Sequence, residues 1–283
     1  MTDLPPGLHG AHLRADLLKQ IGLPAVRSLL RVERLVVFSR HVYVDRERTL
    51  GFLTRAAAAL LTVGPRAVLT GHSAAFLYGC TAADTGMIHV LSGYDRQLRR
   101  RGDLMLHQGS FEEQDVAQLN GLRVLGLERV IADLLCTAPR GTALACADQA
   151  IAGQTPPLRA EFKAEISHRI QTRPDPRGRL RGGVLLLLAT GAPESPAESR
   201  LLLALFDAGL PVPELQYPVC DLDAGSATGS ISRGRSRWSP WSTTAMPRML
   251  TEPSETPSVT RTCAGGAGSS FGLRRGICGS RSR

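Results

Sequence analysis

Lysine is nearly absent from this sequence: only Lys19 and Lys163 occur among 283 residues, while arginine, alanine and glycine abound, as in proteins from GC-rich genomes. Long apolar runs are also lacking. The run at residues 184–189 is far shorter than the ~18 residues of a membrane span. The first residues lack the basic start and apolar run of a secretory signal. We therefore expect a cytoplasmic protein with no membrane partner, and a length that accommodates two or three small domains.

Cysteine pairs with metal-binding spacing are absent as well. None of the six cysteines forms a C-x-x-C pair, so the sequence predicts neither a zinc site nor a disulfide framework. We expect buried free thiols instead. The cysteines are Cys80, Cys136, Cys146, Cys220, Cys263 and Cys278.

The positive charge of the chain is concentrated at its end. The formal net charge is +9, but the residues from Ser226 onward hold nine arginines against Glu252 and Glu255, a net charge of +7. The residues before Ser226 therefore carry only +2. Overall basicity alone does not indicate that the folded part binds nucleic acid.

The segment after Ser226 has no hydrophobic period of 2 or 3.6, which is typical of disorder. Back-translation in GC-rich codons suggests another origin. When their codons are regrouped by one base, residues 239–245 can be read as V-A-V-E-Y-D-G and residues 231–236 as D-L-A-W-P-E. Residues 249–262 regroup to a charged helical pattern, and residues 265–272 to R-G-W-I-V-V-R. In the shifted frame these segments read as a strand, a strand, a helix and a strand, in that order. We therefore predict that residues 226–283 are out of frame. The alternative is a native disordered arginine-rich tail.

The first 50 residues have the pattern of a winged helix-turn-helix. Residues 13–21 predict a helix, 22–24 a turn, 25–31 a second helix, and 35–38 with 41–44 a hairpin. In that layout the second helix enters the DNA major groove, and most contacts go to phosphate. The alternative is a protein-binding module with a solvated arginine face. The candidate DNA-binding residues are Arg27, Ser28, Arg31, Arg34 and Arg40.

Residues 51–155 predict a small α/β middle domain. Its expected elements are helices at 52–62, 68–79, 127–135 and 142–152, and strands at 88–91, 104–107 and 122–125. The basic run at 96–101 is interpreted as a solvated loop, with phosphate binding as the alternative. The neighbours His72 and Ser73 have the chemistry of a base and a nucleophile. No acid motif accompanies them, so we expect Ser73 to be a helix N-cap.

Residues 156–190 predict a linker helix followed by a connector rich in arginine, proline and glycine, and this is the expected domain boundary. A further α/β unit begins within residues 191–225. There, Ser195 is a candidate N-cap and Pro196 the first helical residue, ahead of an apolar face that starts at Leu201. A strand is expected at residues 216–222.

Several of these segments resemble a known family. Residues 40–44 (R-H-V-Y-V), 73–79 (S-A-A-F-L-Y-G), 121–124 (G-L-R-V) and 128–134 (E-R-V-I-A-D-L) resemble bacterial proteins related to the AbiEi-type antitoxin. Residues 195–201 (S-P-A-E-S-R-L) resemble the opening of a very-short-patch-repair-like endonuclease domain. Together the resemblance covers most of the chain before Ser226.

The resemblance implies a restriction-endonuclease-like core, in which one helix acid and acids on two strands hold a divalent metal that activates water. Glu198 matches the helix acid, but its strand partners exist only in the shifted frame. Asp221 and Asp223 follow the first strand, and we do not expect them to be ligands. The site is therefore expected to be a remnant without cofactor, since Mg²⁺ needs several oxygen ligands.

These features predict an α+β protein with an N-terminal winged helix-turn-helix, a small α/β middle domain, an incomplete restriction-endonuclease-like α/β domain and a disordered C-terminal tail. The expected function is that of a DNA-binding, antitoxin- or regulator-like protein whose endonuclease-like domain is inactive. The expected partners are DNA and a cognate toxin. One alternative is a working metal-dependent DNA endonuclease. The other is a non-functional remnant, because the apolar face of the last helix lacks its covering strands.

Overall fold

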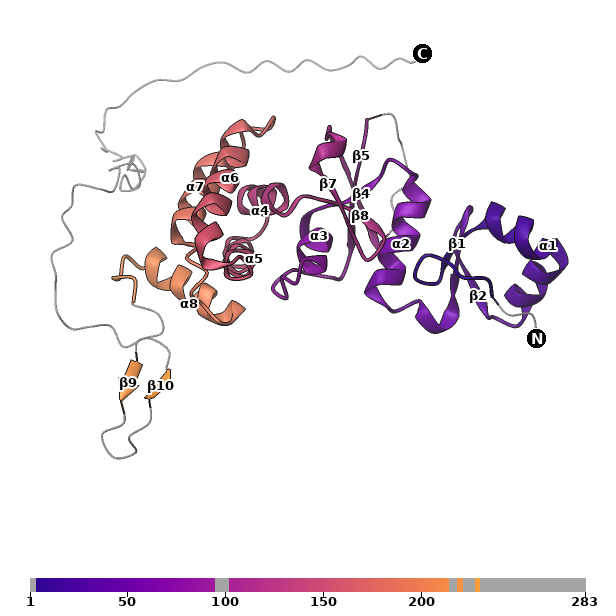
Figure 1. Ribbon diagram of the computed structural model, residues 1–283, viewed down its shortest axis with the longest axis horizontal. Coiled ribbons are helices and arrows are strands. Elements are labelled where there is room, and N and C mark those ends of the chain that lie inside the picture. Colours follow the sequence, from indigo (N-terminus) through magenta and orange to yellow (C-terminus); the bar gives the residue numbers. More distant parts are fainter. Residues whose placement is uncertain (1–3, 95–101, 214–217, 221–226, 230–283) are drawn as a thin grey trace, which may run out of the picture. The chain divides into compact units, whose positions relative to one another are not determined.

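The fold is mixed α/β, with helices and small sheets in sequence along the chain. The computed structural model describes residues 4–94, 102–213, 218–220 and 227–229 (Figure 1). Most buried apolar side chains from residue 11 to residue 203 belong to one continuous core, and a second, smaller cluster lies in the N-terminal module.

The N-terminal module is a three-stranded antiparallel sheet with a broken helix. β1 (Ala11–Leu13) leads into α1 (Arg14–Arg31), and β2 (Leu35–Ser39) and β3 (Val42–Asp45) form a hairpin, in the sheet order β1-β3-β2. Gly22, at φ 76° and ψ 164°, interrupts α1 two residues before Pro24. The two halves of α1 therefore point in different directions, as the sequence predicted. Their shared core is Leu17, Val26, Leu29, Leu35 and Tyr43.

Helix α2 (Phe52–Val63) joins this sheet to the rest of the core, after the 3₁₀ turn η1 (Arg46–Arg48). It contacts both β1 and β3, and its alanines at positions 56–59 are fully buried. Small side chains let a helix approach its neighbours closely. The N-terminal sheet is thus held against the following elements by packing.

The middle of the chain is a five-stranded mixed sheet in the order β6-β5-β4-β8-β7. Its strands are β4 (Val68–Leu69), β5 (Ile88–Ser92), β6 (Leu104–Gln108), β7 (Val116–Leu119) and β8 (Leu122–Leu125). The predicted helix at 68–79 is wrong at its start, because Val68 and Leu69 form the central strand and α3 spans only Gly71–Leu77. A short apolar run does not by itself distinguish a buried strand from a helix.

Strand β7 was not predicted, although the sequence contains its signal. Leu119 pairs with Leu122, so Asn120 and Gly121 form a two-residue hairpin turn. Both residues have positive φ, 51° and 72°. The Asn-Gly dipeptide favours this turn type between antiparallel strands.

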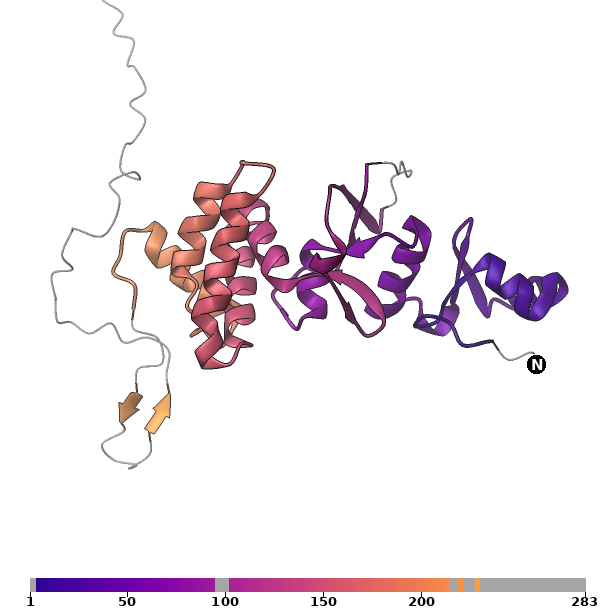
Figure 2. The same ribbon diagram turned by 45° about the horizontal axis from the view of Figure 1, so that its top comes forward.

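Five helices follow the sheet and pack together: α4 (Leu127–Thr137), α5 (Arg140–Ala152), α6 (Arg159–Thr172), α7 (Arg179–Leu188) and α8 (Pro196–Asp207). Helix α6 begins directly after the 3₁₀ turn η3 (Pro156–Leu158). α4 contacts α5, α6 and α7, while α8 contacts α5 (Figures 1 and 2). The helix predicted in residues 156–190 is present as α6, but the segment is not a linker followed by a connector, because α6 and α7 bury Phe162, Ile166, Ile170 and Leu185 in the main core.

Two glycines of the predicted connector, Gly178 and Gly182, are sites of close packing. A Cβ atom on Gly178 would lie 2.2 Å from the carbonyl oxygen of Cys136, and one on Gly182 would lie 2.8 Å from its Sγ. The guanidinium of Arg173 is also fixed, since its Nε donates to Asp133 at 2.7 Å. The segment whose composition predicted a connector is a tight turn that packs against α4.

The last described elements are two short strands. β9 (Pro218–Cys220) pairs antiparallel with β10 (Ala227–Gly229), and β9 falls within the predicted strand at 216–222. β10 lies at the start of the segment predicted to be out of frame, and residues 230–283 lie outside the described residues. Among the helices that the structure describes, none has the length and apolar character needed to cross a membrane.

Substitution of two nearby glycines tests the packing of the 173–190 segment. Gly178→Ala should lower the free energy of unfolding by about 1–2 kcal/mol through its left-handed backbone alone, and further through the clash with Cys136. Gly183→Ala is the matched control: its Cβ meets nothing within 4 Å, and alanine favours a helix interior by about 0.5–1 kcal/mol. Urea titration of both variants measures the difference. Equal stability of the two variants would contradict the close approach.

Candidate nucleic-acid interface

The second half of α1 presents a small polar face. Val26 and Leu29 are buried in the N-terminal core, which directs Arg27, Ser28 and Arg31 to solvent. Within the described residues neither Arg27 nor Arg31 has a carboxylate partner. Their charges are therefore free to meet phosphate, which is the usual target of arginine in DNA complexes.

The other two predicted arginines differ from each other. The Arg34 guanidinium contacts the carboxylate of Glu47 and lies 3.6 Å from that of Asp45, so its charge is largely offset within the hairpin. Arg40 lies in the β2–β3 turn, where its Nε donates to Nε2 of His41 at 2.7 Å, and it remains exposed. Arg34 thus supports the module, whereas Arg40 still faces solvent.

The β2–β3 turn lies beside the start of α1, because the Arg14 N–H donates to the carbonyl of His41 at 2.8 Å. The first half of α1, residues 14–21, separates this turn from Arg27 and Arg31. Eight helical residues extend about 12 Å. The β2–β3 turn and the second half of α1 therefore lie at opposite ends of this first half-helix.

Charge before Ser226 is unevenly distributed. Residues 1–50 hold eight Lys and Arg against five Asp and Glu, a net charge of +3, whereas residues 51–225 hold 17 against 18, a net charge of −1. The module with the free arginines is therefore the basic part of the body. The arginine run at 96–101 lies outside the described residues.

The pair His72 and Ser73 does not form a catalytic dyad. Ser73 Oγ accepts the His89 N–H at 2.8 Å, and the Nδ1 of His72 accepts the Asp84 N–H at 3.4 Å. The predicted N-cap role of Ser73 is also wrong, because Thr70 is the N-cap of α3 and Ser73 lies inside the helix. Ser73 instead connects α3 to β5 through its hydrogen bond with the His89 N–H.

Three histidines meet on this sheet, one each from α3, β5 and β6. The ring centroids of His72 and His89 are 5.3 Å apart and those of His89 and His107 are 5.2 Å apart. The Nε2 of His107 lies 3.1 Å from the Nδ1 of His89. Because only the parallel pairing of β5 with β6 brings His107 to His89, the sequence contains no local signal for this cluster.

Partial burial disfavours the charged form of these histidines. It lowers the pKa of His89 to about 4, with His107 and His72 acting in the same direction and Asp84 opposing. Burial also lowers the pKa of His72, against Asp84, and that of His107, against Asp133. In the described part of the chain, no set of three or more histidine, cysteine or acidic side chains is arranged to hold a metal ion.

Glu198 lies in the first turn of α8, where both its carboxylate oxygens are used. Oε1 accepts from Ser195 Oγ at 3.0 Å, and Oε2 accepts the Glu194 N–H at 3.0 Å. Ser195 in turn accepts the Glu198 N–H, so the two residues cap the helix reciprocally. The N-cap role predicted for Ser195 and the position predicted for Pro196 are confirmed.

The described residues do not form a Mg²⁺ site around Glu198. Among them Glu198 belongs to no group of three or more potential metal ligands, whereas Mg²⁺ requires several oxygen ligands. Asp221 and Asp223 lie outside the described residues. Glu198 is thus a helix-capping acid, with a stabilising charge at a helix N-terminus.

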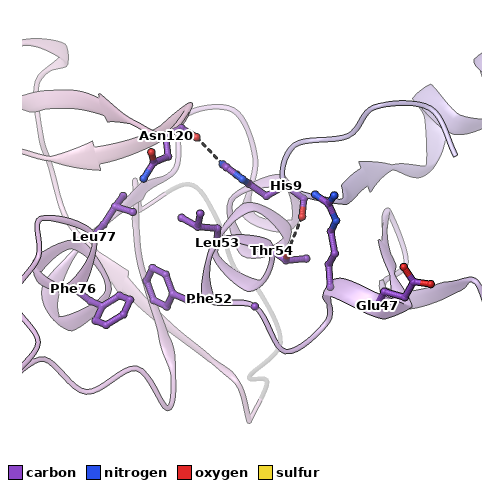
Figure 3. A pocket seen from close by; sticks show the side chains of 10 residues that line it. His9, Glu47, Phe52, Leu53, Thr54, Phe76, Leu77 and Asn120 are labelled. Carbon is purple, nitrogen blue, oxygen red and sulfur yellow. Dashed lines mark hydrogen bonds between the residues drawn. The ribbon is translucent and has the colours of Figure 1, made fainter.

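A pocket of about 550 Å³ lies between the first turn of α2 and the end of α3 (Figure 3). Phe52 and Phe76 meet edge to face in it, with ring centroids 4.6 Å apart. On its upper side His9 Nε2 lies 2.6 Å from the carbonyl oxygen of Asn120, and the Thr54 hydroxyl donates to the carbonyl of His9 at 2.7 Å. These bonds attach the N-terminal segment to both α2 and the β7–β8 turn.

Comparison with known proteins gives relatives without an assigned activity. No family model matches the chain. Two uncharacterized proteins of Mycobacterium tuberculosis, MT2308 of strain CDC 1551 and Rv2248 of strain H37Rv, are each 34% identical to it over 185 residues. The match covers 63% of this chain and 62% of each relative, so the chain spans less than two thirds of their length.

A solved structure, that of the Rv2827c protein from Mycobacterium tuberculosis, has 17% sequence identity and a TM-score of 0.42. The similarity covers 69% of this chain and 75% of that one. A likeness of this degree defines neither a shared fold nor a shared function.

The histidine cluster predicts a pH dependence of stability. Because the folded-state pKa of His89 is about 4 and lies below its ordinary value of 6.5, the unfolded chain binds the proton first. The free energy of unfolding should therefore be constant above about pH 6.5 and fall as pH decreases toward 4. Replacement of the ring by an amide in His89→Gln should reduce this slope, measured by urea titration at several pH values.

Val37→Gln is the control for that experiment, because it adds the same amide to an exposed position on β2, in the other sheet, without removing a histidine. It should keep the slope of the parent protein. The same slope in the parent and in His89→Gln would show that the cluster does not control acid stability.

Proposed function

We propose that the N-terminal module is a winged helix-turn-helix that binds DNA, and that the chain is an antitoxin- or regulator-like protein with an inactive remnant of an endonuclease-like domain. The observation that carries this proposal is the exposed face of Arg27, Ser28 and Arg31 after the break at Gly22. In a winged helix-turn-helix that half-helix reads the major groove.

The module topology supports the same proposal. A strand, two helical segments and a hairpin, with the first strand paired to the last, leave the second helical segment free on one side. The β2–β3 turn with Arg40 serves as the wing that meets the phosphate backbone. Arg34 is not part of this contact set, because its guanidinium is bound by Glu47 and Asp45.

The contacts of Glu198 favour the proposal of an inactive remnant over that of a working endonuclease. A metal-ligating acid needs other oxygen ligands close by. Glu198 instead caps its own helix, and within the described residues it belongs to no group of three or more potential metal ligands. Under this proposal the DNA-binding module acts by occupying DNA, and a cognate toxin is the partner that the family resemblance implies.

DNA binding is tested by gel shift over a salt series. The parent chain should bind duplex DNA at low salt and weaken as salt rises, because binding releases counterions from phosphate. In Arg27→Ala/Arg31→Ala, binding at low salt should weaken about tenfold or more, and the slope of log affinity against log salt should shrink by about 2.

The matched control is Arg66→Ala/Arg200→Ala, which removes the same charge from exposed arginines outside the module that, like Arg27 and Arg31, have no carboxylate partner within the described residues. It should bind as the parent does. Equal loss of binding in both double variants would mean that only net charge matters. No binding by the parent at low salt would reject the DNA-binding proposal.

Catalysis is tested by plasmid nicking with Mg²⁺ or Mn²⁺. We expect no nicking above the metal-free control, both for the parent and for Glu198→Gln, in which the glutamine preserves the reciprocal cap. Metal-dependent nicking that disappears in Glu198→Gln would instead establish the endonuclease alternative.

A further inference from the structure

The pocket between α2 and α3 is lined by four separate parts of the chain (Figure 3). His9 comes from the N-terminal segment and Asn120 from the β7–β8 turn, while the other lining residues come from the stretch 47–54 and from the end of α3. The volume of about 550 Å³ falls within the range of roughly 300–1,000 Å³ that is typical of small-molecule sites. The size of the pocket therefore suits a small ligand.

One part of the lining is apolar and aromatic. Phe52 and Phe76 meet edge to face with ring centroids 4.6 Å apart, and Leu53 and Leu77 lie beside them (Figure 3). Phe76 remains 36% exposed. Aromatic rings pair favourably in edge-to-face and offset-stacked arrangements, so this surface is suited to the ring of an aromatic ligand.

The lining also includes an arginine whose position is fixed. A Cβ atom on Gly10 would lie 2.8 Å from Cδ of Arg48, so the stem of this side chain lies directly against the Gly10 backbone. The Gly51 N–H donates to the carbonyl of Arg48 at 2.9 Å. This turn keeps Arg48 next to the start of α2, since the ends of such a turn lie within about 7 Å of each other.

The charges of the lining favour an anion. Glu47 is the acidic side chain among the lining residues, and its carboxylate contacts the guanidinium of Arg34. Arg48 is exposed and has no carboxylate partner within the described residues. A guanidinium with free donors binds a carboxylate through two parallel hydrogen bonds. The pocket thus combines an aromatic surface with one uncompensated positive charge.

We propose that this pocket binds a small aromatic carboxylate, with the ring against Phe52 and Phe76 and the carboxylate paired with Arg48. One positive charge matches a carboxylate, whereas a phosphate group carries a charge of about −1.5 to −2 at pH 7. The ten lining residues are too few for a protein partner, since a stable interface takes about 20–30 residues a side. This site is separate from the proposed DNA contacts and does not depend on them.

The experiment is a ligand-observed NMR titration of the full chain with 2-naphthoate as the probe. We expect saturable binding with a dissociation constant of about 1 mM or below, the affinity of a ligand of this size at ordinary efficiency. Two further probes separate the contributions. 2-Naphthamide keeps the ring without the charge and acetate keeps the charge without the ring, so each should bind at least about fivefold more weakly.

Variants test the two parts of the lining. Arg48→Gln preserves the stem as far as Cδ and removes the charge, so it should weaken 2-naphthoate at least about fivefold and leave 2-naphthamide unchanged. Phe76→Leu removes a ring and should weaken both probes. Arg66→Gln is the control, because it removes the same charge from an exposed arginine outside the pocket. It should bind 2-naphthoate as the parent does, and all variants should keep the melting temperature within a few degrees.

Four results would overturn the proposal. The first is the absence of saturable binding of 2-naphthoate by the parent chain. The second is a 2-naphthamide affinity equal to that of 2-naphthoate, which would exclude recognition of the carboxylate. The third is parent-like binding in a correctly folded Arg48→Gln or Phe76→Leu, which would place the ligand elsewhere. The fourth is an equal loss in Arg48→Gln and Arg66→Gln, which would mean that only net charge attracts the probe.

Discussion

A single buried carboxylate determines how the helical half of this protein is organised. Asp148 lies on α5 with no exposed surface, and its two oxygens receive three hydrogen bonds, from Thr190, Gly191 and Ser199. Burial raises its pKa, while these hydrogen bonds and the charge of Lys163 lower it. Because an unsatisfied buried carboxylate is costly, the turn between α7 and α8 and the inner side of α8 are held together at one point.

The hydrogen bonds of Asp148 also determine which side of α8 is exposed. With α8 fixed in rotation, Leu202 and Leu203 are buried on the side that packs against α5, while Leu201 remains 46% exposed. The helix ends the described core on one side and offers a second apolar layer on the other.

In the N-terminal module, the pairing of charges separates arginines bound by carboxylates from arginines that remain unpaired among the described residues. Arg34 is bound by two carboxylates in its own hairpin, whereas Arg27 and Arg31 have none among the described residues. All three look alike in the sequence. A free guanidinium has its donors available for phosphate, while a paired one must first break its ion pair. The proposed DNA contact therefore depends on which carboxylates the fold brings close.

The sequence by itself determined the elements that have strong local signals. The period of apolar residues and the Gly-Leu-Pro turn define the two halves of α1, and Ser195 with Pro196 defines the start of α8. Only tertiary structure decided that Val68 and Leu69 form a central strand, that the glycines near residue 178 lie against Cys136, and that three distant histidines meet. The reason is physical: capping and periodicity act over a few residues, whereas strand pairing, close backbone approach and the burial of charge depend on partners far along the chain.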